Sequence, residues 1–218
     1  MPSSERAGSG AAAGLDRLGA YEGLIFDLDG TIVDSMHLHL SAWKHAAERH
    51  GFAFDYATYH AWGGIPSRKV ARLINERQGL TLDAEAVAAT KAEHYLRHIG
   101  EVRPIVATME VIASVHGRLP MAVATGTPRA NLERILAATG LAQYFRATVC
   151  AEDVERHKPY PDTFLLAAER LRVPARRCLV FEDTLTGFAA ATAAGMDCVP
   201  VEAREIRWEG LRPGCAAG

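Results

Sequence analysis

Apolar positions along the chain follow two patterns. Short runs composed mostly of apolar residues, typical of strands buried on both faces, occur at 24–26, 121–124, 147–150, 178–181 and 197–201. Between these runs, apolar residues recur every three or four positions, as on one face of a helix. Strands that alternate with helices predict a parallel sheet covered on both faces. We therefore predict an α/β fold, a Rossmann-like doubly wound parallel sheet.

Local signals set the expected helices of this sheet. Pro128 suits the first position of a helix that runs to Thr139 and closes at Gly140. A second proline, Pro161, opens another helix that runs to about Leu171. The pattern predicts two further helices, at 108–116 and between Asp183 and Gly195.

The stretch from Ser35 to Pro104 has no run of strand character and predicts helices only. Ser35 is placed to cap a helix over 36–50, Val70, Leu73 and Ile74 share one face of a second helix, and Asp83 can cap a third that carries Val87, Lys91 and Tyr95 and ends near Gly100. The predicted division is a disordered leader at 1–20, an α/β core at 21–35 and 104–218, and an all-helical cap domain at 36–103.

Composition narrows the class of protein. Lysine and arginine number 24 and aspartate and glutamate 26, for a formal charge of −2. With no basic stripe or finger spacing, this balance argues against a nucleic-acid partner. Charged residues interrupt every long apolar run, and residues 1–14 lack the apolar core of a signal peptide, which argues against a membrane span or secretion. Cysteines in or beside apolar runs favour a reduced, cytoplasmic setting.

The first strand runs directly into Asp27-Leu28-Asp29-Gly30-Thr31. Alternation along an extended chain places Asp27 and Asp29 on the same side, with Leu28 turned toward the core. Two carboxylates at the mouth of a buried strand are costly unless a cation or a proton offsets them. The plainer alternative is a polar turn, since Asp-Gly is a common turn dipeptide.

Further polar residues follow the other predicted strands, at the edge where ligands bind in such sheets. Two carboxylates ~4 Å apart repel by ~4 kcal/mol at an effective dielectric of 20, so a hard divalent cation such as Mg²⁺ is expected. Lysine and threonine side chains would then bind phosphoryl oxygens, although a helix cap and a solvated loop lysine are the alternatives. The polar residues that follow these strands are Thr125, Gly126, Lys158, Glu182 and Asp183.

Taken in order, Asp27-Leu28-Asp29-Gly30-Thr31, Thr125-Gly126, Lys158-Pro159 and Glu182-Asp183 resemble the four motifs of the haloacid dehalogenase-like phosphohydrolases. The resemblance extends from about Gly23 to Val201. It is closest to the β-phosphoglucomutase-like branch, whose helical cap follows the first motif, and within that branch to the bacterial fructose-1-phosphate phosphatase type.

The resemblance implies a role for each matching residue. Asp27 would be the nucleophile that forms an aspartyl-phosphate, and Asp29 the general acid and base. Asp27, the backbone carbonyl of Asp29 and Asp183 would hold Mg²⁺, with Glu182 as a further ligand or a support behind the ligands. Thr125 and Gly126 would bind the phosphoryl group, and Lys158 would offset charge and orient Asp27.

Two cap residues, His39 and Lys91, match positions that face the active site in the mutase branch and help to bind sugar phosphate. Each has an ordinary alternative. His39 lies one helical turn before Trp43 and can simply pack beside that ring, and Lys91 can be an exposed helix lysine. Ser67 and Arg68 lie near a further cap loop of the family, where the match is ambiguous by one residue, so the resemblance assigns them no role.

The expected function is a Mg²⁺-dependent phosphatase of small sugar or polyol phosphates such as fructose 1-phosphate. The first alternative is a β-phosphoglucomutase, and a remote one is a sugar-phosphate-binding module without activity. Thr31 and Pro128 weakly favour the hydrolase, because mutases tend to have Val and a basic residue there, although Arg129 can partly replace the latter. The expected partner is a small sugar phosphate, and the expected state a monomer or weak dimer.

Overall fold

The structure is a computed structural model that describes residues 15–62 and 65–214. Most of the predicted leader, residues 1–14, lies outside the described residues. The end of that prediction was wrong, because a 3₁₀ turn, η1 (Arg17–Ala20), buries Leu18 against the main apolar core. The ordered core therefore begins before residue 20.

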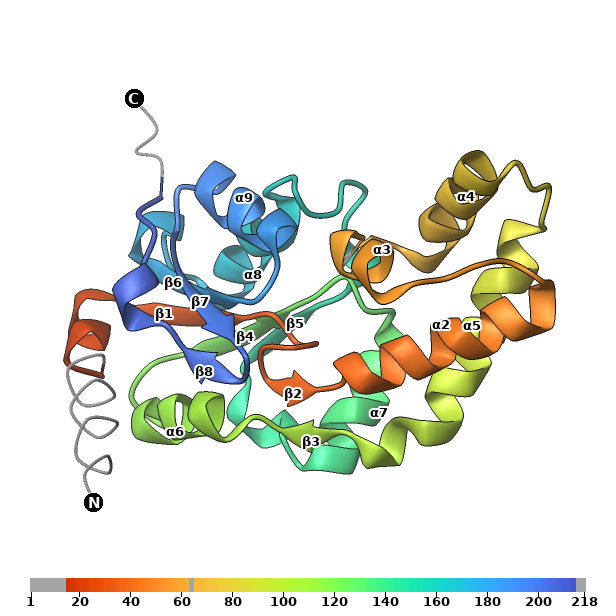
Figure 1. The fold of residues 1–218 in the computed structure, drawn as a ribbon. Helices are drawn as coiled ribbons and strands as arrows, with labels where there is room; N and C mark the ends of the chain where they lie inside the picture. Colours follow the sequence, from red (N-terminus) through yellow and green to blue (C-terminus); the bar gives the residue numbers. More distant parts are fainter. Residues whose placement is uncertain (1–14, 63–64, 215–218) are drawn as a thin grey trace, which may run out of the picture.

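A six-stranded sheet lies at the centre of the molecule, with the strand order β5-β4-β1-β6-β7-β8 (Figure 1). The first five strands are parallel, as predicted, and β8 pairs antiparallel with β7. No strand was predicted at β8, because two residues leave no apolar run. The strands are β1 (Gly23–Phe26), β4 (Met121–Ala124), β5 (Ala147–Val149), β6 (Cys178–Glu182), β7 (Asp197–Glu202) and β8 (Glu205–Ile206).

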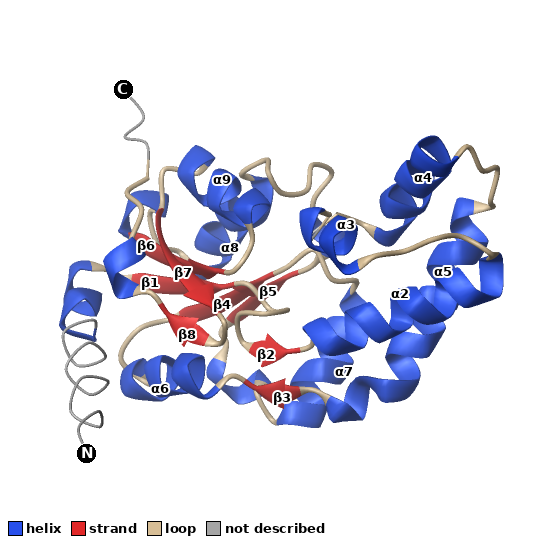
Figure 2. Cartoon of the chain, in the orientation of Figure 1, coloured by secondary structure: helices blue, strands red, loops and turns tan. Residues whose placement is uncertain are grey.

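Successive strand residues point to opposite faces of the sheet, and each face has its own apolar cluster. In β1, Leu24 and Phe26 belong to one cluster and Ile25 to the other. Helices α6 and α7 cover the first face, and α8 and α9 the second (Figure 2). The bounds are α6 (Val106–Val115), α7 (Arg129–Thr139), α8 (Asp162–Leu171) and α9 (Leu185–Ala193), which confirms the doubly wound α/β fold.

The described residues of the predicted insertion form four α-helices, which lie together beyond one end of the sheet (Figure 1). They enclose a small apolar core of their own, which includes Trp43, Val70 and Val87. Asp83 caps the last helix by accepting hydrogen bonds from two backbone N–H groups. The helices are α2 (Met36–His50), α3 (Tyr56–Ala61), α4 (Ser67–Gln78) and α5 (Ala84–His98).

The chain enters and leaves the cap through a two-stranded antiparallel ribbon. Its strands, β2 (Val33–Asp34) and β3 (Arg103–Pro104), were not predicted, since each has only two residues. Arg103 was assigned to the cap and Val33 to the core, so the ribbon lies across the predicted boundary. The remaining 3₁₀ turns are η2 (Ile99–Glu101), η3 (Ala142–Tyr144), η4 (Ala151–Asp153), η5 (Ala175–Arg177) and η6 (Trp208–Gly210).

Two smaller observations concern the environment of the protein. Within the described ranges, no helix is long and apolar enough to span a bilayer. Cys150, Cys178 and Cys198 are buried free thiols, as their apolar neighbours in the sequence predict.

Candidate active site

A cavity of about 690 Å³ lies between the cap and the carboxyl ends of the strands. It forms there because β1, β4 and β6 are neighbours in the sheet, so the residues that follow them converge. Asp183 is not in its wall but lies in the carboxylate cluster at its base. The predicted residues that line the cavity are Asp27, Asp29, His39, Lys91, Thr125, Gly126, Lys158 and Glu182.

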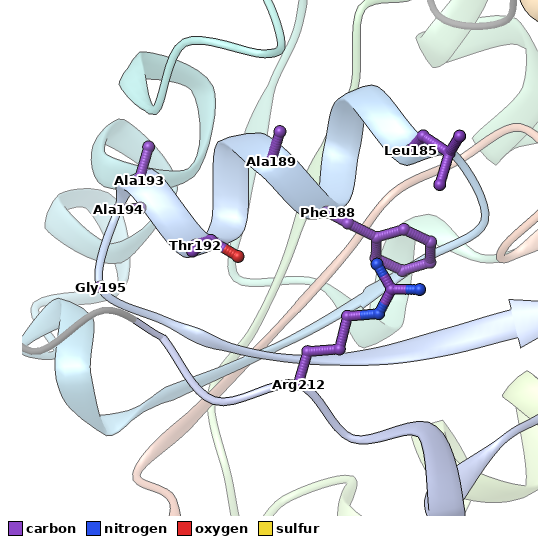
Figure 3. A pocket seen from close by; sticks show the side chains of 8 residues that line it. All are labelled: Leu185, Phe188, Ala189, Thr192, Ala193, Ala194, Gly195 and Arg212. Atoms are coloured by element: carbon purple, nitrogen blue, oxygen red, sulfur yellow. The ribbon is translucent and has the colours of Figure 1, made fainter.

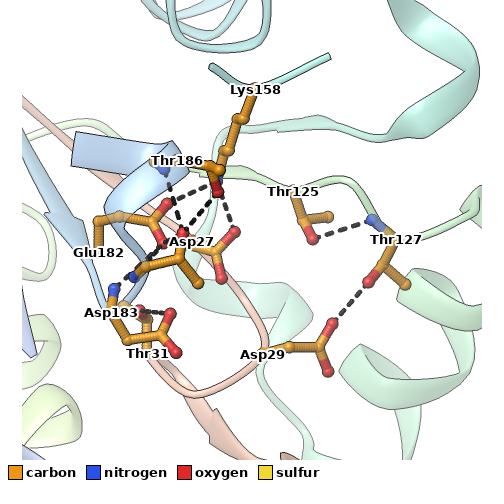
Figure 4. Close-up of polar contacts among 11 residues, drawn as sticks. Asp27, Asp29, Thr31, Thr125, Thr127, Lys158, Glu182, Asp183 and Thr186 are labelled. Carbon is orange, nitrogen blue, oxygen red and sulfur yellow. Dashed lines mark hydrogen bonds and ion pairs between the residues drawn. The ribbon is translucent and has the colours of Figure 1, made fainter. Parts of the chain in front are cut away.

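Lys158 joins two carboxylates at the base of the cavity (Figure 4). Its Nζ lies 2.6 Å from Asp27 Oδ1 and 2.6 Å from Glu182 Oε2, and all three side chains are at least 90% buried. Burial alone lowers the pKa of Lys158, but the charges of Asp27 and Glu182 outweigh burial and raise it. Lys158 is therefore a permanent cation, and the alternative of a solvated loop lysine was wrong.

Three carboxylates, from Asp27, Glu182 and Asp183, bring ligand oxygens within 4.8 Å of one another. Burial, opposed by Lys158 and assisted by Glu182, raises the pKa of Asp27 to about 8. Burial and the charges of Glu182 and Asp27 also raise the pKa of Asp183 well above its usual value. When all three carboxylates are ionised, the one ammonium leaves two negative charges in excess, which a divalent cation with oxygen ligands would offset.

Glu182 is more fully engaged by the protein than the other two acids. Its Oε1 accepts hydrogen bonds from the backbone N–H of Asp183 and from both the N–H and the hydroxyl of Thr184, while Oε2 binds Lys158. A Cβ on Gly187 would lie 2.0 Å from Glu182 Cδ, so this glycine leaves room for the carboxylate. These contacts fit Glu182 better as a support behind a metal site than as a ligand.

Two residues of the first motif shape the position of Asp183. Gly30 has φ of +86°, and a Cβ there would lie 2.2 Å from Asp183 Oδ2. Thr31 donates a hydrogen bond from its hydroxyl to Asp183 Oδ1 at 3.2 Å. The Asp-Gly-Thr segment therefore gives Asp183 both space and a partner.

Asp29 lies in the same cavity but binds a different set of partners. Its Oδ2 accepts a 2.5 Å hydrogen bond from Thr127, and its Oδ1 accepts from Ser35, from Tyr95 at 3.3 Å and from His39 Nε2 at 3.2 Å. Burial favours a higher pKa for Asp29, but the neighbouring His39 and the hydrogen bonds from Ser35 and Thr127 lower it below its usual range. Asp29 is thus held as a carboxylate.

The prediction that Ser35 caps α2 was wrong. Ser35 occupies the position before the helix, yet its side chain makes no capping hydrogen bond, because the hydroxyl donates to Asp29 instead. Ser35, Tyr95 and Thr127 were not predicted as site residues. Only Thr127 had a signal in the sequence, since it stands two positions after Thr125 at the same strand end.

Lys91 and His39 form a chain of hydrogen bonds that leads to Asp29. Lys91 is 93% buried, which contradicts the alternative of an exposed lysine, and its Nζ lies 2.8 Å from His39 Nδ1. Burial and the nearby Lys91 lower the pKa of His39, and burial lowers the pKa of Lys91 to about 8. An ammonium that donates to Nδ1 requires a neutral ring, so we assign the proton of His39 to Nε2, which donates to Asp29. Its ring stacks on Tyr95, with centroids 4.5 Å apart.

Thr125 and Arg129 follow β4 and have different surroundings. Thr125 Oγ1 accepts a hydrogen bond from the backbone N–H of Thr127 at 3.1 Å and retains its own proton for a ligand. It does not cap α7, whose cap residue is Pro128. The Arg129 guanidinium lies 2.6 Å from Asp153 and is absent from the cavity wall. Arg129 thus forms an ion pair with Asp153 and does not replace the basic residue that mutases tend to have at the position of Pro128.

A second hollow lies beside α9 and lacks the chemistry of the first (Figure 3). Its wall is mostly apolar, and its one charged side chain, Arg212, lies over the Phe188 ring at 4.4 Å. Its described lining residues include no carboxylate and, apart from the Thr192 hydroxyl, no side chain that could act as a nucleophile, so this hollow is not the candidate site.

Comparisons with known proteins find similar sequences and folds. The haloacid dehalogenase-like hydrolase family matches residues 24–201. Fructose-1-phosphate phosphatase YqaB of Escherichia coli (strain K12) is 43% identical over 83% of this chain and 96% of its own. Validoxylamine A 7'-phosphate phosphatase of Streptomyces hygroscopicus subsp. limoneus is 32% identical over 82% and 84%. The β-phosphoglucomutase structure from Clostridium difficile has a TM-score of 0.75 at 24% identity over 84% and 85%, which shows a shared fold.

Proposed function

The chain belongs to the haloacid dehalogenase-like hydrolases, and we propose that it is a Mg²⁺-dependent phosphatase of small sugar or polyol phosphates, such as fructose 1-phosphate, that acts through an aspartyl-phosphate. One observation carries the proposal. One cavity contains two carboxylates with different partners. Asp27 is buried and paired with Lys158, whereas Asp29 binds a separate set of hydrogen-bond donors that includes Thr127.

Asp27, Asp183 and the backbone carbonyl of Asp29 are the groups that we propose as ligands of Mg²⁺. The proximity of the three carboxylates and their burial, which raises the pKa of Asp27 and of Asp183, support this set. When bound, Mg²⁺ offsets the charge of the transferring phosphoryl group. Glu182 remains behind the ligands, where it holds Lys158.

Asp27 is the proposed nucleophile. Its free carboxylate oxygen attacks phosphorus, the bond from phosphorus to the sugar oxygen breaks, and the acyl phosphate forms on Asp27. Lys158 fixes the other oxygen through the 2.6 Å hydrogen bond, and its charge opposes the rise in the pKa of Asp27. Thr125 has a hydroxyl proton available for a phosphoryl oxygen.

Asp29 is the proposed acid and base. It takes up a proton when substrate binds and gives it to the departing sugar oxygen; later it takes a proton from the water that attacks the acyl phosphate, which releases phosphate and restores the Asp27 carboxylate. The hydrogen bonds from His39, Ser35 and Thr127 lower its pKa, so a substrate that displaces them favours protonation of Asp29. His39 and Lys91, which control one of these bonds, are the proposed substrate-facing residues of the cap.

The position of Arg129 supports hydrolysis in preference to mutase activity. Arg129 is paired with Asp153 and is not in the cavity wall, so the loop after β4 supplies no second cation to bind phosphate.

The cysteines support a reduced compartment. The buried free thiols of Cys150, Cys178 and Cys198 fit the cytoplasm, and we propose that location.

A phosphate-release screen tests the proposal. We expect metal-free enzyme to be inactive, Mg²⁺ to restore release of phosphate from fructose 1-phosphate, and Ca²⁺ to support little turnover. In a parallel assay, β-glucose 1-phosphate with a trace of the 1,6-bisphosphate should give phosphate and little glucose 6-phosphate. Full activity in EDTA would contradict the metal, and rapid formation of glucose 6-phosphate without phosphate would show a mutase.

A further inference from the structure

The end of the cavity away from the carboxylate cluster is built by cap residues. Apolar side chains dominate it, among them Trp62, Ile65 and Ala88. Arg68, in the first turn of α4, and Glu85, in the first turn of α5, also line the cavity, and Arg68 Nε lies 2.7 Å from Glu85 Oε2. The cap therefore presents an arginine to the cavity together with a carboxylate that neutralises it.

We propose that the Arg68–Glu85 ion pair makes the enzyme selective for substrates with a single phosphate. This inference rests on the proposed phosphatase function, and it names Glu85 as a specificity-determining residue. A substrate whose phosphate lies over Asp27 and Lys158 extends toward the cap. Its far end then meets apolar side chains and a neutral ion pair, which accept a hydroxyl or carbon end but not a second phosphate dianion.

The other cationic side chains of the cavity already bind side chains of the protein. Among the described lining residues, lysine and arginine are represented by Lys158, Lys91 and Arg68. Lys158 binds Asp27 and Glu182, and Lys91 donates to His39. A second phosphate would thus have to draw Arg68 away from Glu85 while remaining close to the displaced carboxylate. At ~6 Å in a water-like dielectric, one carboxylate disfavours a dianion by about tenfold.

The test compares fructose 1-phosphate with fructose 1,6-bisphosphate through the ratio of their kcat/KM values. Glu85→Gln removes the carboxylate and releases Arg68, so we expect the ratio to shift about tenfold toward the bisphosphate. The shift should shrink in about 0.5 M NaCl, because salt screens exposed charges. In the double variant with Arg68→Gln, most of the gain should disappear, since it requires the released guanidinium.

Glu93→Gln is the matched control. Glu93 is also on α5 in an exposed ion pair, with Arg97 at 3.0 Å, but it does not line the cavity. The two single variants change the net charge equally, so only an effect specific to Glu85 supports the proposal. An unchanged ratio in Glu85→Gln, an equal shift in Glu93→Gln, or a wild-type enzyme that uses both substrates equally would overturn it. Absence of fructose 1-phosphate hydrolysis in every protein would instead contradict the phosphatase function.

Discussion

Replacement of Lys158 by methionine removes the one ammonium in the buried carboxylate cluster while keeping an unbranched side chain. The variant leaves Asp27 and Glu182 without the cation that lies 2.6 Å from each. Breaking a buried ion pair by removing one partner costs about 3–5 kcal/mol. We expect a loss of about 3 kcal/mol in the free energy of unfolding of metal-free protein at pH 8.5, or roughly 6–12 °C in Tm for a chain of this length.

The loss should depend on pH in a defined direction. Asp27 has its pKa raised from 3.8 to about 8 in the folded state, so the folded protein holds a proton that the unfolded chain loses at lower pH. The contribution of Asp27 to the free energy of unfolding is fully present below about pH 4 and is lost as the pH rises to about 8. At pH 6, below this pKa, Asp27 is protonated in the wild type, and without Lys158 it stays so in the variant, so only the pair with Glu182 is broken and we expect a smaller loss, about 1 kcal/mol.

Urea unfolding at pH 6 and pH 8.5, in EDTA and in Mg²⁺, measures these differences. Mg²⁺ at about 100 times its Kd should add about 2.7 kcal/mol to either protein at pH 8.5. Lys44→Met, at an exposed position on α2, is the control and should change stability by less than about 0.5 kcal/mol. A variant as stable as wild type at pH 8.5 in EDTA, or one that loses more at pH 6, would refute the reasoning.

Three further substitutions test the site. Asp27→Asn should leave a folded protein with turnover reduced by about a thousandfold or more, and retention of several per cent, after deamidation is excluded, would remove its role as nucleophile. Asp29→Asn should lose far more single-turnover activity on sugar phosphates than on p-nitrophenyl phosphate, whose leaving group needs little protonation; equal losses would argue against acid catalysis. Gly187→Ala should destabilise the protein by about 1–3 kcal/mol, because the added Cβ would meet Glu182. Gly100→Ala, where the added Cβ lies in open space, should leave the stability unchanged. Thermal unfolding compares the two variants, and equal Tm values would contradict the packing argument.

The parts of the fold that follow from local chemistry were predictable. The predicted bounds of α2 and the cap of α5 are confirmed, since Gly51 (φ +72°) and the Asp83 carboxylate act over a few residues. The convergence of Asp27, Thr125 and Glu182 also followed, because it needs only parallel strands. β2, β3 and β8 could not be found in this way, because strands of two residues depend on tertiary pairing.

The partners of individual side chains were harder to predict. The sequence around Lys91 is that of any helix lysine, and only the packing of α2 on α5 buries it beside His39. Likewise, a serine before a helix predicts a cap, but a carboxylate six residues earlier competes for the same hydroxyl and binds it. Long-range contacts decide both cases, and a single sequence does not contain them.

The β2–β3 ribbon has a consequence for the folding of the core. Without it, pairing β1 with β4 must close a loop of the roughly ninety residues between Phe26 and Met121. Once Val33 pairs with Pro104, the cap lies outside that loop, which shortens to roughly a quarter of its length. The free-energy cost of closing the loop, which is entropic, then falls by about 1 kcal/mol. To the core, the whole cap is topologically equivalent to the turn of a hairpin that joins Asp34 to Arg103.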